Sequence, residues 1–289
     1  MRLSKSEKAF NILNLIFMIF FVAIIALPLL NILALSFNDA NDSLRGGIYF
    51  WPRQFSVESY KTVFENQAIY LAFGVSVLKT VVGVVLHTFV TAISAYALTR
   101  EDLVGRKFYT TLGILAMFVS GGLIPTFLVF KAYGLLNNFW VYILPVLFSF
   151  YDVIIMMNFF KGIPRSLEES AMIDGAKPFT IFFKIIIPLS MPVIATIALY
   201  HGVYQWNDYM TANIFVDNEK LFPLQQLLYR VIAQNISPAA QTGAAVARKT
   251  TSQSLQLATM VITTIPVVIV YPFLQKYFVN GLTLGAVKE

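Results

Sequence analysis

Six long stretches without a charged residue constrain the fold of this chain more than any other feature. They cover residues 9–37, 80–99, 108–130, 132–151, 185–207 and 250–275. Each is long enough to cross the hydrocarbon of a bilayer, about 30 Å, as a helix of about 20 residues. The apolar residues do not alternate with the period of two that a membrane β-barrel requires. We therefore predict an all-α, polytopic membrane protein with six transmembrane helices, whose backbone hydrogen bonds are satisfied internally.

Composition and charge agree with this fold class and indicate a topology. Hydrophobic residues make up 57% of the chain and charged residues only 12%, against about 25% charged residues in ordinary soluble domains. Basic residues favour the short loops on the side of the N-terminus, which predicts that both termini are cytoplasmic. The net charge of +6 is explained by these flanks, so we expect lipid contact and no nucleic-acid partner. The first apolar run lacks a cleavage site and is expected to remain as an anchor.

The sequence predicts one membrane domain with short cytoplasmic ends. We expect a cytoplasmic tip at residues 1–8, the six-helix domain at 9–280, and a cytoplasmic tail at 281–289. Two external regions, near residues 38–67 and 206–253, are too long to be simple turns and contain turn-forming residues. No internal repeat at a fixed period is visible.

No residue pattern in the chain points to catalysis, a metal or a nucleotide. The sequence contains no Walker-type Gly-x-x-x-x-Gly-Lys-Ser/Thr string, no Gly-x-Ser-x-Gly elbow and no His-Glu-x-x-His helix. It has no cysteine, and its two histidines, His87 and His201, fall on separate predicted spans. We therefore expect no catalytic residue, no metal site and no cofactor bound by this chain. A nucleotide that drives it would be bound by another subunit.

Residues 166–176 form a polar island between two predicted spans. Ser166 followed by Glu169 has the spacing of a capping box and predicts a helix start. Asp174 and Gly175 predict the turn that ends this helix, and Pro178 suits the first turn of the next one. A helix of about two turns is too short to be stable alone, so we expect a partner surface on another subunit. Under the simpler interpretation, Glu169 is only a cap and Asp174-Gly175 only a stop signal.

The same segment resembles the EAA loop of permeases from binding-protein-dependent ABC importers. It reads Glu-Glu-Ser-Ala-Met-Ile-Asp-Gly-Ala from Glu168 to Ala176, with Ser170 in place of one alanine. Trp206-Asn207-Asp208 and the ending 281–288 are similar to the maltose-type carbohydrate branch. Ser-Gly-Gly-Leu-Ile-Pro at 120–125 is similar to its complex-oligosaccharide subgroup. The resemblance extends over nearly the whole chain.

This resemblance implies a MetI-like, type I ABC importer permease that moves an oligosaccharide into the cytoplasm by alternating access. It implies a coupling helix at 166–176 that sits in a cleft of an ATPase subunit, with Glu168 or Glu169 meeting a basic residue there. The expected coupling residues are Glu168, Glu169, Ser170, Ala171, Asp174, Gly175 and Ala176. The implied partners are a second permease, two ATPase subunits that bind ATP and magnesium, and an extracytoplasmic sugar-binding protein docked on the external loops. The implied location is a prokaryotic cytoplasmic membrane, with the tail at 281–289 between the ATPases.

Aromatic, amide and carboxylate side chains are the groups that contact sugars, and several lie within or beside the predicted spans. The candidate pathway residues are Tyr151, Asp152, Tyr200, Tyr204, Gln205, Trp206 and Asn207. Asp152 stands out because an ionised carboxylate inside a span normally faces a cavity or a partner. Lys79 is expected either to pair with Asp152 or to reach the outer surface. For each of these polar residues, a structural role in hydrogen bonds between helices remains an alternative.

Two prolines predict a bend. Pro188 and Pro192 remove backbone hydrogen bonds on one face of the fifth span.

Two other classes of protein are alternatives to an ABC permease. An ion-coupled secondary carrier would need inverted repeats and titratable groups at mid-membrane, where only Lys79 and Asp152 are available. A membrane-embedded enzyme would need a catalytic constellation, and a scaffold protein would not need the coupling segment.

Overall fold

The computed structural model describes residues 4–236 and 251–286, and the regular elements in these ranges are helical, apart from one isolated bridge between Asn38 and Phe55. The helices of the first half are α1 (Lys5–Ser36), α2 (Ala40–Ser43), α3 (Glu58–Glu65), α4 (Gln67–Thr99), α5 (Arg106–Phe118) and α6 (Leu123–Ala132). The short turns η1 (Phe139–Tyr142) and η2 (Leu144–Val146) precede α7 (Phe150–Lys161), α8 (Arg165–Ile173) and α9 (Pro178–Ile181). The π-helical turn η3 (Phe182–Ile186) leads into α10 (Ile187–Leu189), α11 (Met191–Asn207) and α12 (Met210–Phe215). The last elements are η4 (Glu219–Leu221), α13 (Leu224–Ile236) and α14 (Ser252–Ala286).

The chain divides into two compact units, which are described separately. Unit one comprises residues 1–69 and 228–265, and unit two comprises residues 70–227 and 266–289. In unit one, Ser4 and Glu7 form a capping box that starts α1. The expected tip at residues 1–8 is therefore helical from Lys5, and residues 1–3 lie outside the described part. Side chains of α1 are exposed around the helix from Phe10 to Leu30, as expected of a helix whose solvent is lipid.

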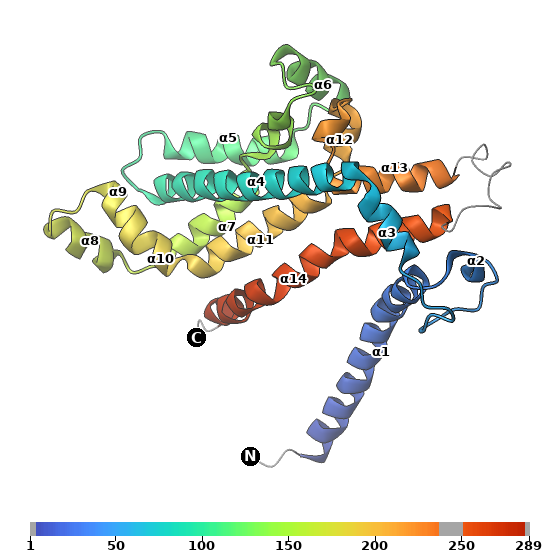
Figure 1. The fold of residues 1–289 in the computed structure, drawn as a ribbon. Coiled ribbons are helices and arrows are strands. Elements are labelled where there is room, and N and C mark those ends of the chain that lie inside the picture. The colour runs from blue at the N-terminus through green and yellow to red at the C-terminus, as the bar shows by residue number, and fades with distance from the viewer. Residues whose placement is uncertain (1–3, 237–250, 287–289) are drawn as a thin grey trace. The chain divides into compact units, whose positions relative to one another are not determined.

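Unit two is held by an apolar core at one end. Ala92 and Ala95 of α4, Val153 and Met156 of α7, and Ile197 of α11 are buried together. This core also includes Phe182 and Ile186 from the turn η3, which the bent helix carries against α4. The four elements α4, α5, α7 and α11 run alongside one another in Figure 1, with α8 and α9 at one end.

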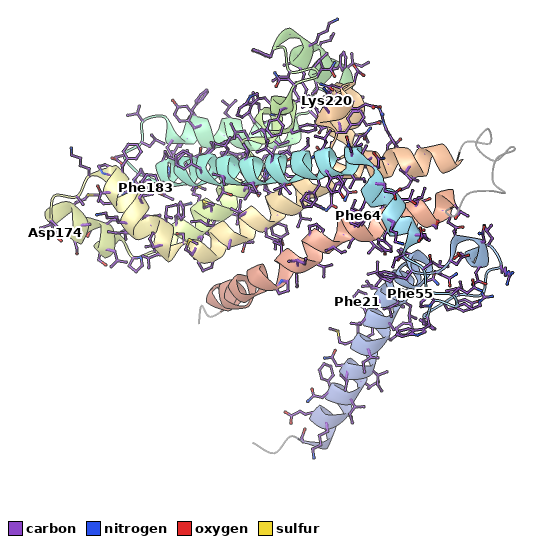
Figure 2. All side chains as sticks on the ribbon, in the orientation of Figure 1. Phe21, Phe55, Phe64, Asp174, Phe183 and Lys220 are labelled. Atoms are coloured by element: carbon purple, nitrogen blue, oxygen red, sulfur yellow. The ribbon has the colours of Figure 1, made fainter. Side chains whose placement is uncertain are left out.

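A second core lies at the other end of unit two, around the residues that follow α11. Tyr142 and Ile143 pack there with Ala212, Phe215 and Phe222. Asn137 ties two loops together, because its Oδ1 accepts hydrogen bonds from the backbone of Asp217 at 2.5 Å and of Asn218 at 3.0 Å. Lys220, in this end of the unit, and Asp174, beside α8, are labelled at opposite ends of unit two in Figure 2.

Three helices are long and apolar enough to cross a membrane, and three bent helix pairs raise the number to six if each pair is one span. The long helices are α1, α4 and α14. The pairs are α5 with α6, η1 and η2 with α7, and α9 and α10 with α11, bent by 118°, 52° and 80°. These elements coincide with the six apolar stretches. The fourth uncharged stretch, 132–151, ends before Asp152, and α7 continues past it to Lys161, so Asp152 lies inside the span as predicted.

The bends have local causes in the sequence. Gly122, between α5 and α6, has φ of +81°, a conformation that costs glycine little. Ser190 separates α10 from α11, where Pro188 and Pro192 stand at the starts of the two helices. The predicted bend in the fifth span is confirmed at 80°. At the other terminus, α14 continues through residue 280 to Ala286, so most of the expected tail is helical and residues 287–289 lie outside the described part.

Close packing of α5 on α7 gives a first testable prediction. A Cβ added at Gly113 would clash with the ring of Phe150, which is itself buried. We expect Gly113→Ala to destabilise the protein by roughly 1–3 kcal/mol, because an overpacked core must shift to relieve the clash. Thermal unfolding in detergent measures this change.

The matched control is Gly74→Ala. Gly74 lies within α4, and its added Cβ would meet nothing within 4 Å. This variant should be neutral or more stable by up to about 1 kcal/mol, because alanine favours the helix. Equal stability of the two variants would contradict the packing of α5 on α7.

Candidate functional site

The nine-residue helix α8 ends in a well-formed C-terminal cap. Ala176 N donates to Ala171 O at 2.9 Å and Gly175 N donates to Met172 O at 3.0 Å, the two hydrogen bonds of a Schellman motif. Gly175 adopts φ of +78°, as the predicted Asp-Gly turn requires. Pro178 then stands in the first turn of α9, as predicted.

The predicted capping box at Ser166 and Glu169 is wrong. The helix starts one residue earlier, at Arg165, after Pro164, and no side chain caps its first turn. Pro164 sets the chain direction through its restricted φ, so the start of α8 needs no side-chain cap.

Two ion pairs hold α8 against the end of α4 and the loop that follows it. Arg100 donates through Nη2 to the carboxylate of Glu168 and to the hydroxyl of Tyr96. Its guanidinium also lies over the Tyr96 ring, 4.3 Å from the centroid. Arg165 donates to Glu101 at 2.5 Å. We call these four charged residues, Arg100, Glu101, Arg165 and Glu168, the clasp.

The outer pair of the clasp is fully solvated and is formed at neutral pH. The hydrogen bond from Arg165 holds the pKa of Glu101 below its ordinary value. The contribution of this pair is therefore present above the ordinary carboxyl pKa and is lost only as pH falls through the lowered one. Screening by water keeps that contribution small, so the pair mainly orients α8.

The clasp distinguishes the two adjacent glutamates of the EAA-like segment. The Glu168 side chain is half-buried and bound to Arg100, whereas Glu169, Ser170, Asp174 and Gly175 are exposed. The small residues Ala171 and Ala176 pack on the apolar core of unit two. Of the predicted pair, Glu169 is the exposed one.

An apolar cavity of about 590 Å³ lies beside α8. Met172, Phe179 and Phe182 line one part of it, and Tyr96 and Arg100 another. Helix α8 thus presents an acidic, exposed surface next to an apolar hollow.

A buried polar network joins α4, α7 and α11 within unit two. The rings of His87 and His201 stack in parallel, with centroids 3.9 Å apart. His87 Nε2 lies 3.0 Å from Asp152 Oδ2, and Nδ1 lies 3.0 Å from Val146 O. Gln205 Nε2 donates to Tyr142 O at 2.8 Å and lies 3.4 Å from His201 Nε2.

Hydrogen-bond chemistry fixes part of the protonation of this network. A carbonyl oxygen only accepts, so His87 Nδ1 carries a hydrogen directed at Val146 O. The contact between Nε2 and Asp152 then holds one further proton, on either atom. Both arrangements leave the pair with no net charge, which lowers the cost of placing a carboxylate within a span.

Lys79 and Asp208 form a second buried pair at the opposite end of unit two from α8. Lys79 is 0% exposed, and its Nζ donates to Asp208 O at 2.8 Å and to Oδ2 at 3.3 Å. The ammonium also lies 4.8 Å from the ring centroid of Tyr142. The prediction that Lys79 pairs with Asp152 or reaches the outer surface is therefore wrong, because Asp208 lies closer in the fold and Asp152 is bound by His87.

The structure distributes the predicted pathway residues between surface and interior. Tyr151, Tyr200, Tyr204 and Asn207 are exposed, and Asp152 is partly exposed. Gln205 is 0% exposed, and Trp206 is buried. The contact of His87 and His201 with Asp152 was not predicted from the sequence. Nothing in the spacing of these residues along the chain shows that they lie at the same height on the packed helices α4, α7 and α11.

Comparison with known proteins decides the family. The family described as "Binding-protein-dependent transport system inner membrane component" matches residues 4–284. The chain belongs to this family. It is a multi-pass ABC transport permease, a membrane transport subunit rather than an enzyme, with the MetI-like fold. Among residues 4–236 and 251–286, no group of three or more His, Asp or Glu side chains is placed to hold a metal ion.

Several relatives are similar to this permease over nearly their whole length. The polygalacturonan/rhamnogalacturonan transport system permease protein YtcP of Bacillus subtilis (strain 168) is 41% identical over 260 residues, which are 90% of this chain and 91% of that protein. Protein LplC of the same organism is 38% identical over 288 residues, 100% of this chain and 98% of that protein. In a crystal structure of a bacterial ABC transporter involved in the import of the acidic polysaccharide alginate, one chain matches with a TM-score of 0.89 and 29% identity, covering 96% of this chain and 99% of that chain.

The Lys79–Asp208 pair gives a prediction for the permease. We expect Lys79→Met to destabilise it by about 3–5 kcal/mol, because the change leaves Asp208 buried without its counter-charge. The double variant Lys79→Met/Asp208→Asn should recover most of the loss, since Asn keeps the oxygen that accepts from Thr211 N at 3.1 Å. Thermal unfolding in detergent distinguishes the two variants, and a single variant as stable as the parent protein would contradict the pair.

Proposed function

We propose that this chain is one of two permease subunits of an ABC importer that moves an oligosaccharide into the cytoplasm by alternating access. The observation that carries the proposal is the family match, together with the exposed acidic surface of α8. ATP and magnesium would bind to two separate ATPase subunits. An extracytoplasmic binding protein would deliver the sugar, and both termini would lie in the cytoplasm of a prokaryote, whose cytoplasmic membrane holds the permease.

The coupling role of α8 is inferred from its position and from the residues that it exposes. Glu169, Ser170, Asp174 and Gly175 face outward, which suits a contact with an ATPase cleft. Ala171 and Ala176 let α8 lie close to its own core. Glu168, by contrast, acts through Arg100 on the end of α4. We infer that Glu169 meets the ATPase and that Glu168 passes the movement of α8 to α4.

The transport pathway would use the exposed aromatic side chains. Tyr200 and Tyr204 are four residues apart on α11 and share one helical face, and Tyr151 opens α7. Their rings suit the CH faces of a sugar, with Asp152 and Asn207 available for hydroxyl groups. Gln205 and Trp206 would shape this region from the interior, because both are buried. The end of α14, which includes most of the expected tail at 281–289, would contact the ATPases.

We also propose that the substrate is an acidic oligosaccharide. The relative that is 41% identical carries the name of a polygalacturonan/rhamnogalacturonan permease, and the structural relative belongs to an importer of the acidic polysaccharide alginate. Both names refer to polymers of uronic acids or containing them. Membership of the family does not specify an acidic sugar, so this substrate class requires its own test.

Two glycines test the coupling role of α8. Gly175 and Gly134 have φ of +78° and +67°, and each follows a helix that ends in the same pair of hydrogen bonds, at Ala176 and Gly175 for α8 and at Leu135 and Gly134 for α6. Gly175→Asp and Gly134→Asp therefore impose similar backbone strain, about 1 kcal/mol. We expect both proteins to insert, and only Gly175→Asp to lose ATPase assembly and uptake. Normal uptake in Gly175→Asp would refute the assignment.

Transport assays with two sugar classes test the substrate. The assembled importer in proteoliposomes, with its binding protein, should show uptake and stimulated ATP hydrolysis with oligogalacturonates. Neutral oligosaccharides of the same length should give little of either. Preference for the neutral series would overturn the acidic substrate while leaving the importer function in place, whereas uptake by the chain without any ATPase would overturn the importer function itself.

A further inference from the structure

The loop after α1 presents a cluster of exposed aromatic side chains. Tyr49, Phe50, Trp51 and Phe55 are 68%, 58%, 84% and 70% exposed. We call these four residues the aromatic loop surface. Four large aromatic side chains in seven residues are unusual on a surface in contact with water alone, so a partner is expected to cover them.

This loop is held in one conformation by its polar groups. Asp39 N donates to Gln54 O at 2.7 Å, and Ser56 N donates to Phe37 O at 2.8 Å. The buried side chain of Asn38 accepts from Gln54 N at 2.8 Å and donates to Asp42 Oδ2 at 3.1 Å. These hydrogen bonds join the two ends of the loop, and the four aromatic side chains between them stay exposed.

Asn31 sets the level of the loop along α1. Its Nδ2 donates to Ile48 O at 2.8 Å and to Tyr49 O at 3.0 Å. Asn31 lies five residues before the end of α1 at Ser36, which corresponds to about 7 Å along the helix axis. The chain thus folds back along its own span, and Phe55 lies beside the last part of α1 in Figure 2.

Asn31 follows the longest unbroken apolar run of the span. Residues 15–30 are apolar without exception, and Asn31 is the first polar residue after them. The 16 residues of that run extend about 24 Å as a helix, most of the hydrocarbon thickness of a bilayer. We infer that the backbone held by Asn31 lies near the height where hydrocarbon gives way to lipid headgroups.

We propose that the aromatic loop surface is an interfacial anchor that binds the phospholipid bilayer and that Asn31 sets its depth. Tyrosine and tryptophan favour this zone because one part of the ring is apolar and another forms hydrogen bonds. Arg45 and Arg53 lie in the same loop, and both pair with Asp42, at 3.7 Å and 3.5 Å. Their side chains remain 73% and 45% exposed, which suits contact with lipid phosphates. The anchor fixes the height of α1, whose exposed sides offer no other depth marker between residues 15 and 30.

The test uses single cysteines, because the chain contains none of its own. Spin labels are placed at Trp51→Cys, at Lys61→Cys on α3 as the water reference, and at Phe17→Cys on α1 as the hydrocarbon reference. The full chain, in its assembled importer, is reconstituted in vesicles of phosphatidylcholine and phosphatidylglycerol. An assembly without added cysteines gives the background from the partner subunits.

The measured quantity is the ratio of the label's collision rate with oxygen to its collision rate with a water-soluble nickel chelate. We expect this ratio at position 51 to be several-fold above that at position 61. Adding Asn31→Leu should lower this ratio several-fold while the label at position 17 stays unchanged. Nickel access at 51 equal to that at 61 would overturn the anchor. Shielding from both reagents would also overturn it, because a protein surface would then cover the loop. No change with Asn31→Leu would overturn the role of Asn31.

Discussion

Unit two depends on the pairing of ionisable side chains within its own chain. An unpaired charge at the centre of a span costs about 2.5–3.5 kcal/mol on insertion scales, and both charges of this kind have partners. Lys79 binds Asp208, and His87 Nε2 lies 3.0 Å from Asp152 Oδ2. Each pair joins α4 to a segment more than sixty residues later in the sequence. The contacts that compensate the charges therefore also bring the distant segments together.

Helix α4 connects the two ends of unit two. Its 33 residues extend about 50 Å. The part between Lys79, which binds Asp208, and Tyr96, beside the clasp, is about 25 Å long. The clasp attaches α8 to the C-terminal end of this helix, while the covalent connections of α8 lead to α7 and α9. A displacement of α8 therefore has three routes into the helices of unit two, and one of them reaches the opposite end through a single rigid element.

The local features around α8 were predictable because they depend on neighbouring residues. Gly175 adopts the left-handed conformation expected of the Asp-Gly turn, and Pro178 starts the next helix. The capping box failed because Pro164 starts α8 earlier than Ser166 would. The uncharged run 132–151 ends before Asp152, but the fourth span continues to Lys161, and His87 lies at hydrogen-bond distance from the Asp152 carboxylate. The partner of Lys79 was also missed, since nothing near it in sequence indicates Asp208.

By itself, the sequence determined that the chain is embedded in lipid, that its fold is helical, how many apolar stretches it has and which family it belongs to. These follow from composition and from motifs whose residues are adjacent, such as the EAA-like segment. Only the tertiary structure decided which of the two adjacent glutamates of that segment is exposed, which side chains pair with Lys79 and Asp152, and how far the loop after α1 folds back. Those outcomes depend on distances between residues far apart in the chain, and such distances exist only once the helices have packed.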